Sequence, residues 1–275
     1  MVVQHNLQAA NTNRQLGITT SAQAKSTEKL SSGYKINRAA DDAAGLSISE
    51  KMRSQIRGLN KASSNAQDGV SLVQTAEGAL NETHSILQRM NELATQAANG
   101  TNTSVDRSAI RAELDQLTSE INRIQSTTQF NTMNLLDGTF SGATKQMKLQ
   151  VGALSGQSIN FSIANMCATK IGLNKDLSVS TFTKAGSYMK SVQDAIEVVS
   201  KQRSAMGAIQ NRLEHTIANL DTTSENTQSA ESRIRDTDMA SEMVTYSKNN
   251  ILAQAGQSML AQANQSTQGV LSLLQ

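Results

Sequence analysis

The chain has 275 residues, with no proline, no tryptophan and one cysteine. Aromatic residues make up only 3% of it, too few to fill a rounded globular core, whereas a 37% hydrophobic content rich in alanine favours long, closely packed helices. The formal net charge is +2 without a basic block, and no apolar run approaches the length of a membrane span, which argues against nucleic-acid partners and membrane insertion.

The first segment, residues 3–30, is compatible with a helix but has a broken apolar stripe. Its apolar positions are Val3, Leu7, Ala10, Leu16, Ile18, Ala22 and Leu30. Isolated helices of this kind are marginal in water, because most helical stability comes from packing. We therefore expect the segment to be poorly ordered in a free subunit and ordered in an assembly. The polar start at Met1 is not typical of a secretory signal peptide.

A long helix is predicted from Asp42 to Asn99, where apolar or small residues recur every seven positions. The repeat consists of Leu59, Ala66, Val73, Leu80, Leu87 and Ala94. A proline-free stretch with this repeat is typical of a coiled coil. Asp41 and Asp42 can cap its first turn, and Asn99-Gly100 supplies a stop signal.

A shorter helix is predicted next, from apolar residues spaced four and three positions apart. They are Ile110, Leu114, Leu117, Ile121 and Ile124. After Asp137-Gly138, glycines separate two β-like runs, 147–151 and 158–163, which indicate a small hairpin.

Helix is predicted again from about Tyr188, with a second seven-residue repeat. Its members are Val192, Val199, Met206, Leu213 and Leu220. Because the two long helices carry matching apolar seams, each is the natural partner of the other. The sequence therefore predicts a mainly α fold: a long antiparallel helical coiled-coil rod with a small β-hairpin region and its chain ends together.

The last segment, residues 251–274, again has a weak apolar stripe. It is formed by Ile251, Ala255, Met259, Ala263, Val270, Leu273 and Leu274. Like the first segment, it is expected to order on association.

No residue pattern indicates catalysis or a cofactor. The histidines His5, His84 and His215 are isolated and lack metal-site spacing, and Cys167 has no evident base. Charged residues cluster near the end of the second long helix: Arg233, Arg235, Asp236 and Asp238. The cluster allows three interpretations. It could be a catalytic group, although catalysis would need a pocket; it could be a solvated charged face; or it could form ion pairs between subunits. We therefore predict no enzyme activity, no metal and no cofactor.

Several motifs resemble those of bacterial flagellin, in family order. They are Leu-Ser-Ser-Gly-Tyr-Lys-Ile-Asn at 30–37, Ala-Asp-Asp-Ala-Ala-Gly-Leu at 40–46, Thr-Gln-Phe-Asn at 128–131 with Asn-Leu-Leu-Asp-Gly at 134–138, and the matching carboxy-terminal runs at 232–238, 249–256, 260–265 and 269–274. Two features depart from the family: Gln265 to Gln268 contains no proline, so helix should continue closer to the terminus, and Cys167 is unusual.

The resemblance implies a structural subunit that polymerises into the bacterial flagellar filament for motility. Residues 1–42 and 236–275 would form an inner coiled-coil domain, and 43–235 a rod domain with the hairpin region at about 138–180. Outer domains would be absent, giving a short form. Such proteins are extracellular and leave unfolded through the flagellum's own export apparatus without a cleaved signal peptide.

The resemblance also implies sites and partners. Self-assembly is assigned to Leu7, Ile251, Met259, Val270, Leu273, Leu274, Arg233 and Asp236. Recognition by animal Toll-like receptor 5 is assigned to Gln88, Arg89, Leu93 and Glu113, on a surface buried in the polymer. The other partners are further copies of the chain, an export chaperone, and cap or junction proteins. The alternatives are a hook–filament junction protein, which caps rather than propagates, and a secreted enzyme, which would need a large central domain.

Overall fold

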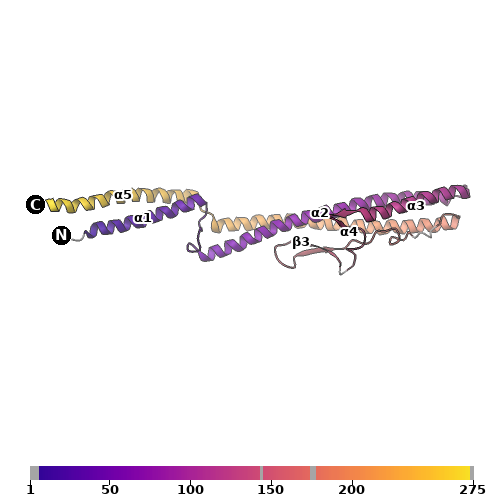
Figure 1. Ribbon diagram of the computed structural model, residues 1–275, viewed down its shortest axis with the longest axis horizontal. Helices are drawn as coiled ribbons and strands as arrows, with labels where there is room; N and C mark the ends of the chain where they lie inside the picture. Colours follow the sequence, from indigo (N-terminus) through magenta and orange to yellow (C-terminus); the bar gives the residue numbers. More distant parts are fainter. Residues whose placement is uncertain (1–5, 143–144, 174–177, 273–275) are drawn as a thin grey trace. The chain divides into compact units, whose positions relative to one another are not determined.

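The computed structural model describes residues 6–142, 145–173 and 178–272. The elements follow in the order α1 (Leu7–Ser32), α2 (Ala43–Ala97), α3 (Ser104–Thr127), β1 (Gln129–Phe130), β2 (Met133–Asn134), β3 (Met147–Gln150), β4 (Ser158–Phe161), α4 (Phe182–Arg235) and α5 (Met239–Ser272) (Figure 1). The predicted mainly α fold is confirmed, with the long helices packed in pairs, α1 with α5 and α2 with α4.

The chain divides into two compact units. The first comprises residues 1–55 and 225–275, and the second comprises residues 56–224. These limits fall inside α2 and α4, whereas the domain limits expected from the sequence, at 42/43 and 235/236, coincide with helix ends.

The second unit contains the predicted seam between α2 and α4. Every residue of both seven-residue repeats is buried: Leu59, Ala66, Val73, Leu80, Leu87 and Ala94 on α2, and Val192, Val199, Met206, Leu213 and Leu220 on α4. The pairing is antiparallel, because Ser63 donates a hydrogen bond of 2.9 Å to Asp221, whereas Thr95 contacts Met189 at 3.4 Å.

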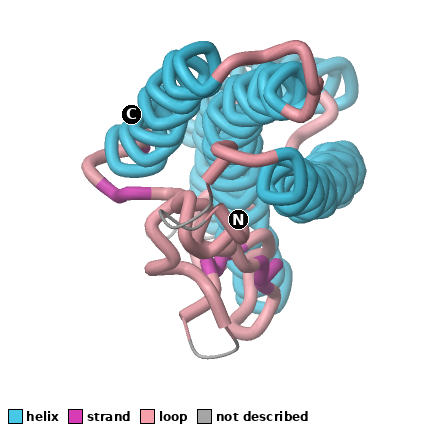
Figure 2. The backbone as a smooth tube through the Cα atoms, turned by 90° about the vertical axis from the view of Figure 1, so that its right-hand side faces the viewer, coloured by secondary structure: helices cyan, strands magenta, loops and turns pink. Residues whose placement is uncertain are grey.

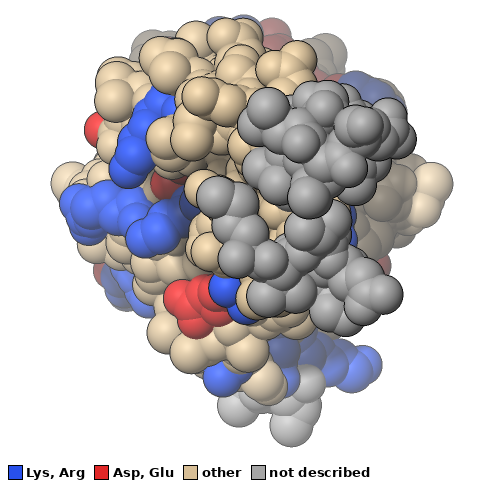
Figure 3. Space-filling model, turned by 90° about the vertical axis from the view of Figure 1, so that its left-hand side faces the viewer, with Lys and Arg blue, Asp and Glu red and all other residues tan. Residues whose placement is uncertain are grey.

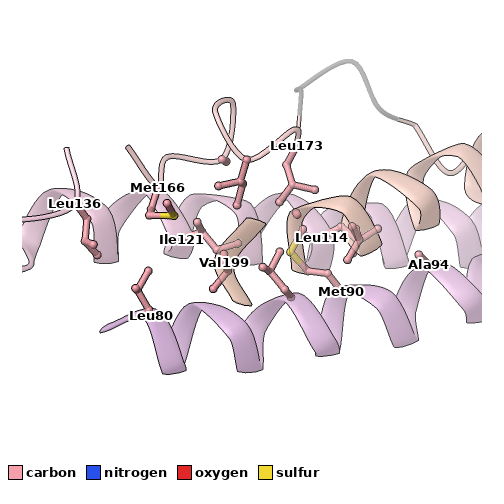
Figure 4. Close-up of a cluster of buried hydrophobic side chains, with 14 of the residues drawn as sticks. Leu80, Met90, Ala94, Leu114, Ile121, Leu136, Met166, Leu173 and Val199 are labelled. Carbon is pink, nitrogen blue, oxygen red and sulfur yellow. The ribbon is translucent and has the colours of Figure 1, made fainter. Parts of the chain in front are cut away.

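A three-helix core lies where α3 joins this pair. Ile110, Leu114 and Ile121 of α3 are buried in the same cluster as Leu80 and Met90 of α2. Figure 4 shows Leu80, Met90, Leu114 and Ile121 in one cluster with a residue of α4, Val199, and with three residues of the segment between α3 and α4, Leu136, Met166 and Leu173. The loop residues therefore close the core on the side that the helices leave open.

The predicted hairpin is present as β3 and β4, paired antiparallel with Met147 opposite Phe161 and Gln150 opposite Ser158. It approaches α2 at two glycines. A Cβ placed at Gly69 would meet the Leu149 side chain, and one at Gly58 would lie 2.8 Å from the Ala153 Cβ. In Figure 2 the strands and loops lie beside the helices rather than between them.

A second, smaller hairpin, β1–β2, was not predicted from the sequence. Its two-residue turn has positive φ at Asn131 (48°) and Thr132 (63°), as a tight antiparallel hairpin requires. Because threonine rarely adopts this conformation, residue preferences alone did not indicate the turn.

The starts of α2 and α4 and the end of α5 can be compared with the prediction. Asp42 caps α2 as predicted, because its Oδ1 accepts a hydrogen bond from the Gly45 N–H at 2.9 Å. The helix α4 begins at Phe182 rather than near Tyr188, after Thr181, whose Oγ1 accepts from the Lys184 N–H. The prediction of helix close to the terminus is confirmed, since α5 continues to Ser272.

Candidate functional site

The first unit is built on α1 and α5, which run antiparallel side by side (Figure 1). Asn6 caps α1 by accepting from the Ala9 N–H and also donates to the Ala263 carbonyl at 3.0 Å. At the other end, Lys29 pairs with Glu242 at 3.6 Å.

The buried residues of this pair are small. Among the described residues of α1 and α5, the buried ones are Ser26, Ala253 and Ala263. A Cβ at Gly256 would lie 3.2 Å from the Leu16 side chain, so the helices come close there. Because buried apolar area sets the size of the hydrophobic contribution, the pair gains little stability from its own contact.

The outward side of α5 carries large apolar residues among polar ones. Six large apolar residues of α5 are exposed, and we refer to them together as the α5 apolar face: Met239, Met243, Val244, Ile251, Leu252 and Met259. Val244 and Ile251 are one repeat apart and are 70% and 66% exposed. On α1, Leu7 and Ile18 are also exposed. Several large apolar side chains exposed on the outward side of a helix favour a protein interaction site.

The predicted assembly residues fall partly on this surface. Leu7, Ile251 and Met259 are exposed in the first unit. The Val270 side chain, Leu273 and Leu274 lie outside the part of the chain whose side chains are described. Arg233 and Asp236 are both exposed, at the junction of α4 and α5.

The junction of α4 and α5 is tied to the loop that follows α1. The Lys35 N–H donates to the Arg235 carbonyl at 2.7 Å, and the Thr237 N–H donates to the Gly33 carbonyl at 3.0 Å. The Arg235 guanidinium lies 4.7 Å from the Tyr34 ring centre and pairs with Glu50 at 2.8 Å. These contacts give Arg235 a structural part, because its side chain is only 13% exposed.

The sequence-predicted recognition residues lie on and beneath the surface of α2 and α3. Arg89 is 52% exposed and donates to Glu113 at 3.0 and 3.2 Å and to Glu92 at 3.3 Å. Gln88 is exposed and is hydrogen-bonded to the His84 ring at 3.0 Å. Leu93 is only 2% exposed and belongs to the three-helix core. The structure thus brings Arg89 and Glu113 together and places Leu93 below them.

Catalytic and metal chemistry find no support in residues 6–142, 145–173 and 178–272. Within these ranges no three metal-ligating side chains gather, and no described helix has an apolar stretch long enough to cross a bilayer. The Cys167 thiol lies 3.2 Å from the Thr169 hydroxyl, which is not a base. His5 lies outside the described residues. In Figure 3 basic side chains form separate groups on a largely uncharged face.

Comparisons with known proteins identify the family to which the chain is similar. The profile of the bacterial flagellin N-terminal helical region matches residues 3–141, and that of the C-terminal helical region matches residues 189–274. The chain is 54% identical to a flagellin of Halalkalibacterium halodurans over 276 residues, covering 100% of both chains. The crystal structure of Bacillus cereus flagellin has a TM-score of 0.51 at 31% identity and covers 57% of this chain and 88% of that one.

A fold likeness extends to another flagellar protein. A putative flagellar hook-associated protein from Vibrio parahaemolyticus has a TM-score of 0.60 at 15% identity, covering 71% of this chain and 100% of that one. At that identity the likeness concerns the fold alone.

Long helices packed in pairs, with exposed apolar residues on α5, define a class of elongated helical proteins. The sequence matches then make the family definite: the chain belongs to the bacterial flagellins. It is of the short form, and the N- and C-terminal helical regions account for most of its length. It is a structural subunit of the extracellular flagellar filament that serves motility, and it is not an enzyme.

Proposed function

We propose that α1 and α5 form the inner domain of the filament, residues 1–42 and 236–275, and that the α5 apolar face joins neighbouring copies during polymerisation. Residues 43–235 then form the rod. The observation that carries this proposal is the contrast between the two helix pairs. The α2·α4 seam is buried within one chain, whereas α5 keeps six large apolar side chains exposed.

The energetics favour burial of this face against another copy. Burying a large apolar side chain contributes about 1.5–3 kcal/mol. Burial of the α5 apolar face against a neighbouring copy would therefore add the apolar stabilisation that the α1·α5 contact lacks. Contacts between different surfaces of identical copies do not close on themselves and therefore propagate as a helical filament. In this proposal the chain ends become ordered only when a subunit adds to the filament. Free subunits therefore do not polymerise until they meet a growing tip.

Deletion of residues 251–275 tests the proposal. We expect the truncated chain to keep a folded rod, seen as retained helical circular dichroism, and to form no filaments by electron microscopy. Normal filaments from this deletion would overturn the proposal.

A point variant makes the test more specific. Replacing Val244 and Ile251 by serine should abolish filaments, because it removes the two most exposed apolar side chains of the face. The control is Gln257→Ser on the same helix, an exposed polar residue, which should polymerise like the parent chain.

Residues 251–275 are also the proposed binding site of the export chaperone. A helix with exposed apolar residues and no stable partner would need a bound protein to shield those residues before export. Residues 251–275 alone should then bind the chaperone. Cap and junction proteins would meet only the subunits at the filament ends.

A junction protein was the alternative function expected from the sequence. The filament subunit is favoured because the chain is 54% identical to a flagellin over its whole length, whereas its likeness to the hook-associated protein is one of fold. Purified chain should elongate filament seeds without limit, and growth that stops after one added layer would favour the junction protein.

We also propose that Toll-like receptor 5 recognises free subunits through Arg89. Support comes from its exposed guanidinium, which Glu113 and Glu92 hold in place, since arginine is enriched at interface hot spots. Gln88 and Glu113 flank it, and Leu93 supports the helix from the core. An Arg89→Ala subunit should lose receptor affinity, whereas Arg123→Ala, another exposed and paired arginine, should not. Equal affinities of the two variants would contradict this role.

A further inference from the structure

The α5 apolar face has an unusual composition. Three of its six members are methionines, Met239, Met243 and Met259, with exposures of 48%, 51% and 55%. Other methionines of the chain, Met90, Met166 and Met206, are at most 2% exposed. The chain therefore presents thioether groups to solvent on the face proposed to join copies, while it encloses comparable groups in the rod core.

The three methionines lie on both sides of the row formed by Val244 and Ile251. At 100° per residue, Met239 and Met243 fall on one side of that row and Met259 falls on the other. A change of polarity at the three sulfur atoms would therefore affect the whole width of the face.

We propose that Met239, Met243 and Met259 are a reversible oxidation site, and that their conversion to sulfoxides by a peroxide stops a free subunit from joining a filament. This inference rests on the proposed role of the α5 apolar face in assembly. It adds a modification site and a chemical condition under which assembly fails.

The chemical step is a two-electron oxygen transfer. A sulfur lone pair attacks one oxygen of hydrogen peroxide, the O–O bond breaks as the S–O bond forms, and the departing hydroxide takes up the remaining proton to leave as water. Sulfur is oxidised and peroxide is reduced. Methionine sulfoxide reductases reverse the change.

The product no longer suits an apolar interface. A sulfoxide oxygen is a strong hydrogen-bond acceptor, and burying it against a second copy without a donor is unfavourable. In water the same oxygen is fully solvated, so the free subunit tolerates it. Addition to a filament would also bury the thioethers and protect them from peroxide.

The experiment compares full-length subunits with filaments made from them, each treated with hydrogen peroxide. Peptide mass spectrometry gives the rate of oxidation at each methionine, and sedimentation gives the polymerised fraction. We expect the three methionines to be oxidised at least tenfold faster in subunits than in filaments, and oxidised subunits to lose polymerisation. Treatment with the reductases should restore it.

Matched variants separate the site from general damage. The triple variant Met239→Leu, Met243→Leu, Met259→Leu keeps the face apolar and should polymerise after peroxide treatment. Met133→Leu, which removes an exposed methionine of β2, should leave the chain peroxide-sensitive.

Two results would overturn the inference: equal peroxide sensitivity of the triple variant, or equal oxidation rates in subunits and filaments. Failure of the proposed function would be seen differently, as normal filaments from the 251–275 deletion without any peroxide.

Discussion

The glycines of α2 differ in what surrounds them. A Cβ added at Gly58 would lie 2.8 Å from the Ala153 Cβ and 3.2 Å from its Cα, so the hairpin tip would have to move. A Cβ at Gly78 would meet nothing within 4 Å. Gly58 is therefore needed for close approach of the hairpin, whereas Gly78 only adds flexibility to a helix.

Alanine at these two positions should have opposite effects. Gly78→Ala should stabilise the chain by about 0.5–1 kcal/mol, because it removes the entropy penalty of a helical glycine. Gly58→Ala should destabilise it by about 1–3 kcal/mol through overpacking. Urea denaturation of both variants checks the difference, and similar stabilisation by both would show that the hairpin does not rest on α2 at Gly58.

Asp41 is held as a carboxylate in the loop between α1 and α2. Its strongest partner is Lys25, whose Nζ lies 2.9 Å from Oδ1, and the Arg38 and Asn37 N–H groups also donate to it. These bonds lower the pKa of Asp41 from 3.8 to about 2.

The sign of the pH dependence follows from this shift. Because the folded pKa is the lower one, the contribution of Asp41 to stability is complete above about pH 3.8 and is lost as the pH falls through about 2. NMR titration of Lys25→Met should show the pKa of Asp41 moving back toward 3.8, whereas Lys25→Arg should keep it low. An unchanged pKa in Lys25→Met would exclude the ion pair as the main cause.

Among the helices, α3 has the best-defined start. The Thr103 hydroxyl accepts from the Asp106 N–H at 3.3 Å, and Asp106 Oδ2 accepts from the Thr103 N–H at 2.8 Å. The two residues thereby satisfy each other's free backbone donors in a capping box.

Removal of the Thr103 side chain should weaken the start of α3. Thr103→Ala should destabilise the chain by about 0.5–2 kcal/mol and increase hydrogen exchange in the first turn of α3. Thr101→Ala, in the same loop, serves as the control and should have little effect. If both substitutions cost the same, α3 does not depend on its cap.

The long helices could be predicted from the sequence because their repeat extends over many turns. Each repeated position, from Leu59 to Leu220, proved to be buried. The start of α4 and the β1–β2 turn depend on one or two residues, and so local preferences did not indicate them. The burial of Leu93 beneath Arg89, and of Arg235 beside Tyr34 and Glu50, depends on segments far apart in the chain. Short sequence patterns do not predict contacts between segments that are far apart in the chain.

The two compact units differ in how they are stabilised. The second unit has a continuous apolar core shared by α2, α3 and α4. In the first unit, the buried residues described in α1 and α5 are small, Ser26, Ala253 and Ala263. Local unfolding is easiest where few apolar contacts hold an element, so α1 and α5 should open far more readily than α2 and α4.

Hydrogen exchange can test this difference in both states of the protein. In free subunits, amides of α1 and α5 should exchange much faster than those of residues 59–94 and 192–220, because only small side chains are buried where α1 and α5 pack. In filaments, neighbouring copies would cover the α5 apolar face, and the same amides should become protected while those of the rod change little. The Val244 and Ile251 serine variant, which keeps α5 but lacks the two most exposed members of its apolar face, should show fast exchange at any concentration. Protection of α1 and α5 in free subunits equal to that of α2 and α4 would mean that the ends are already stable, and that ordering of the ends does not control when the filament grows.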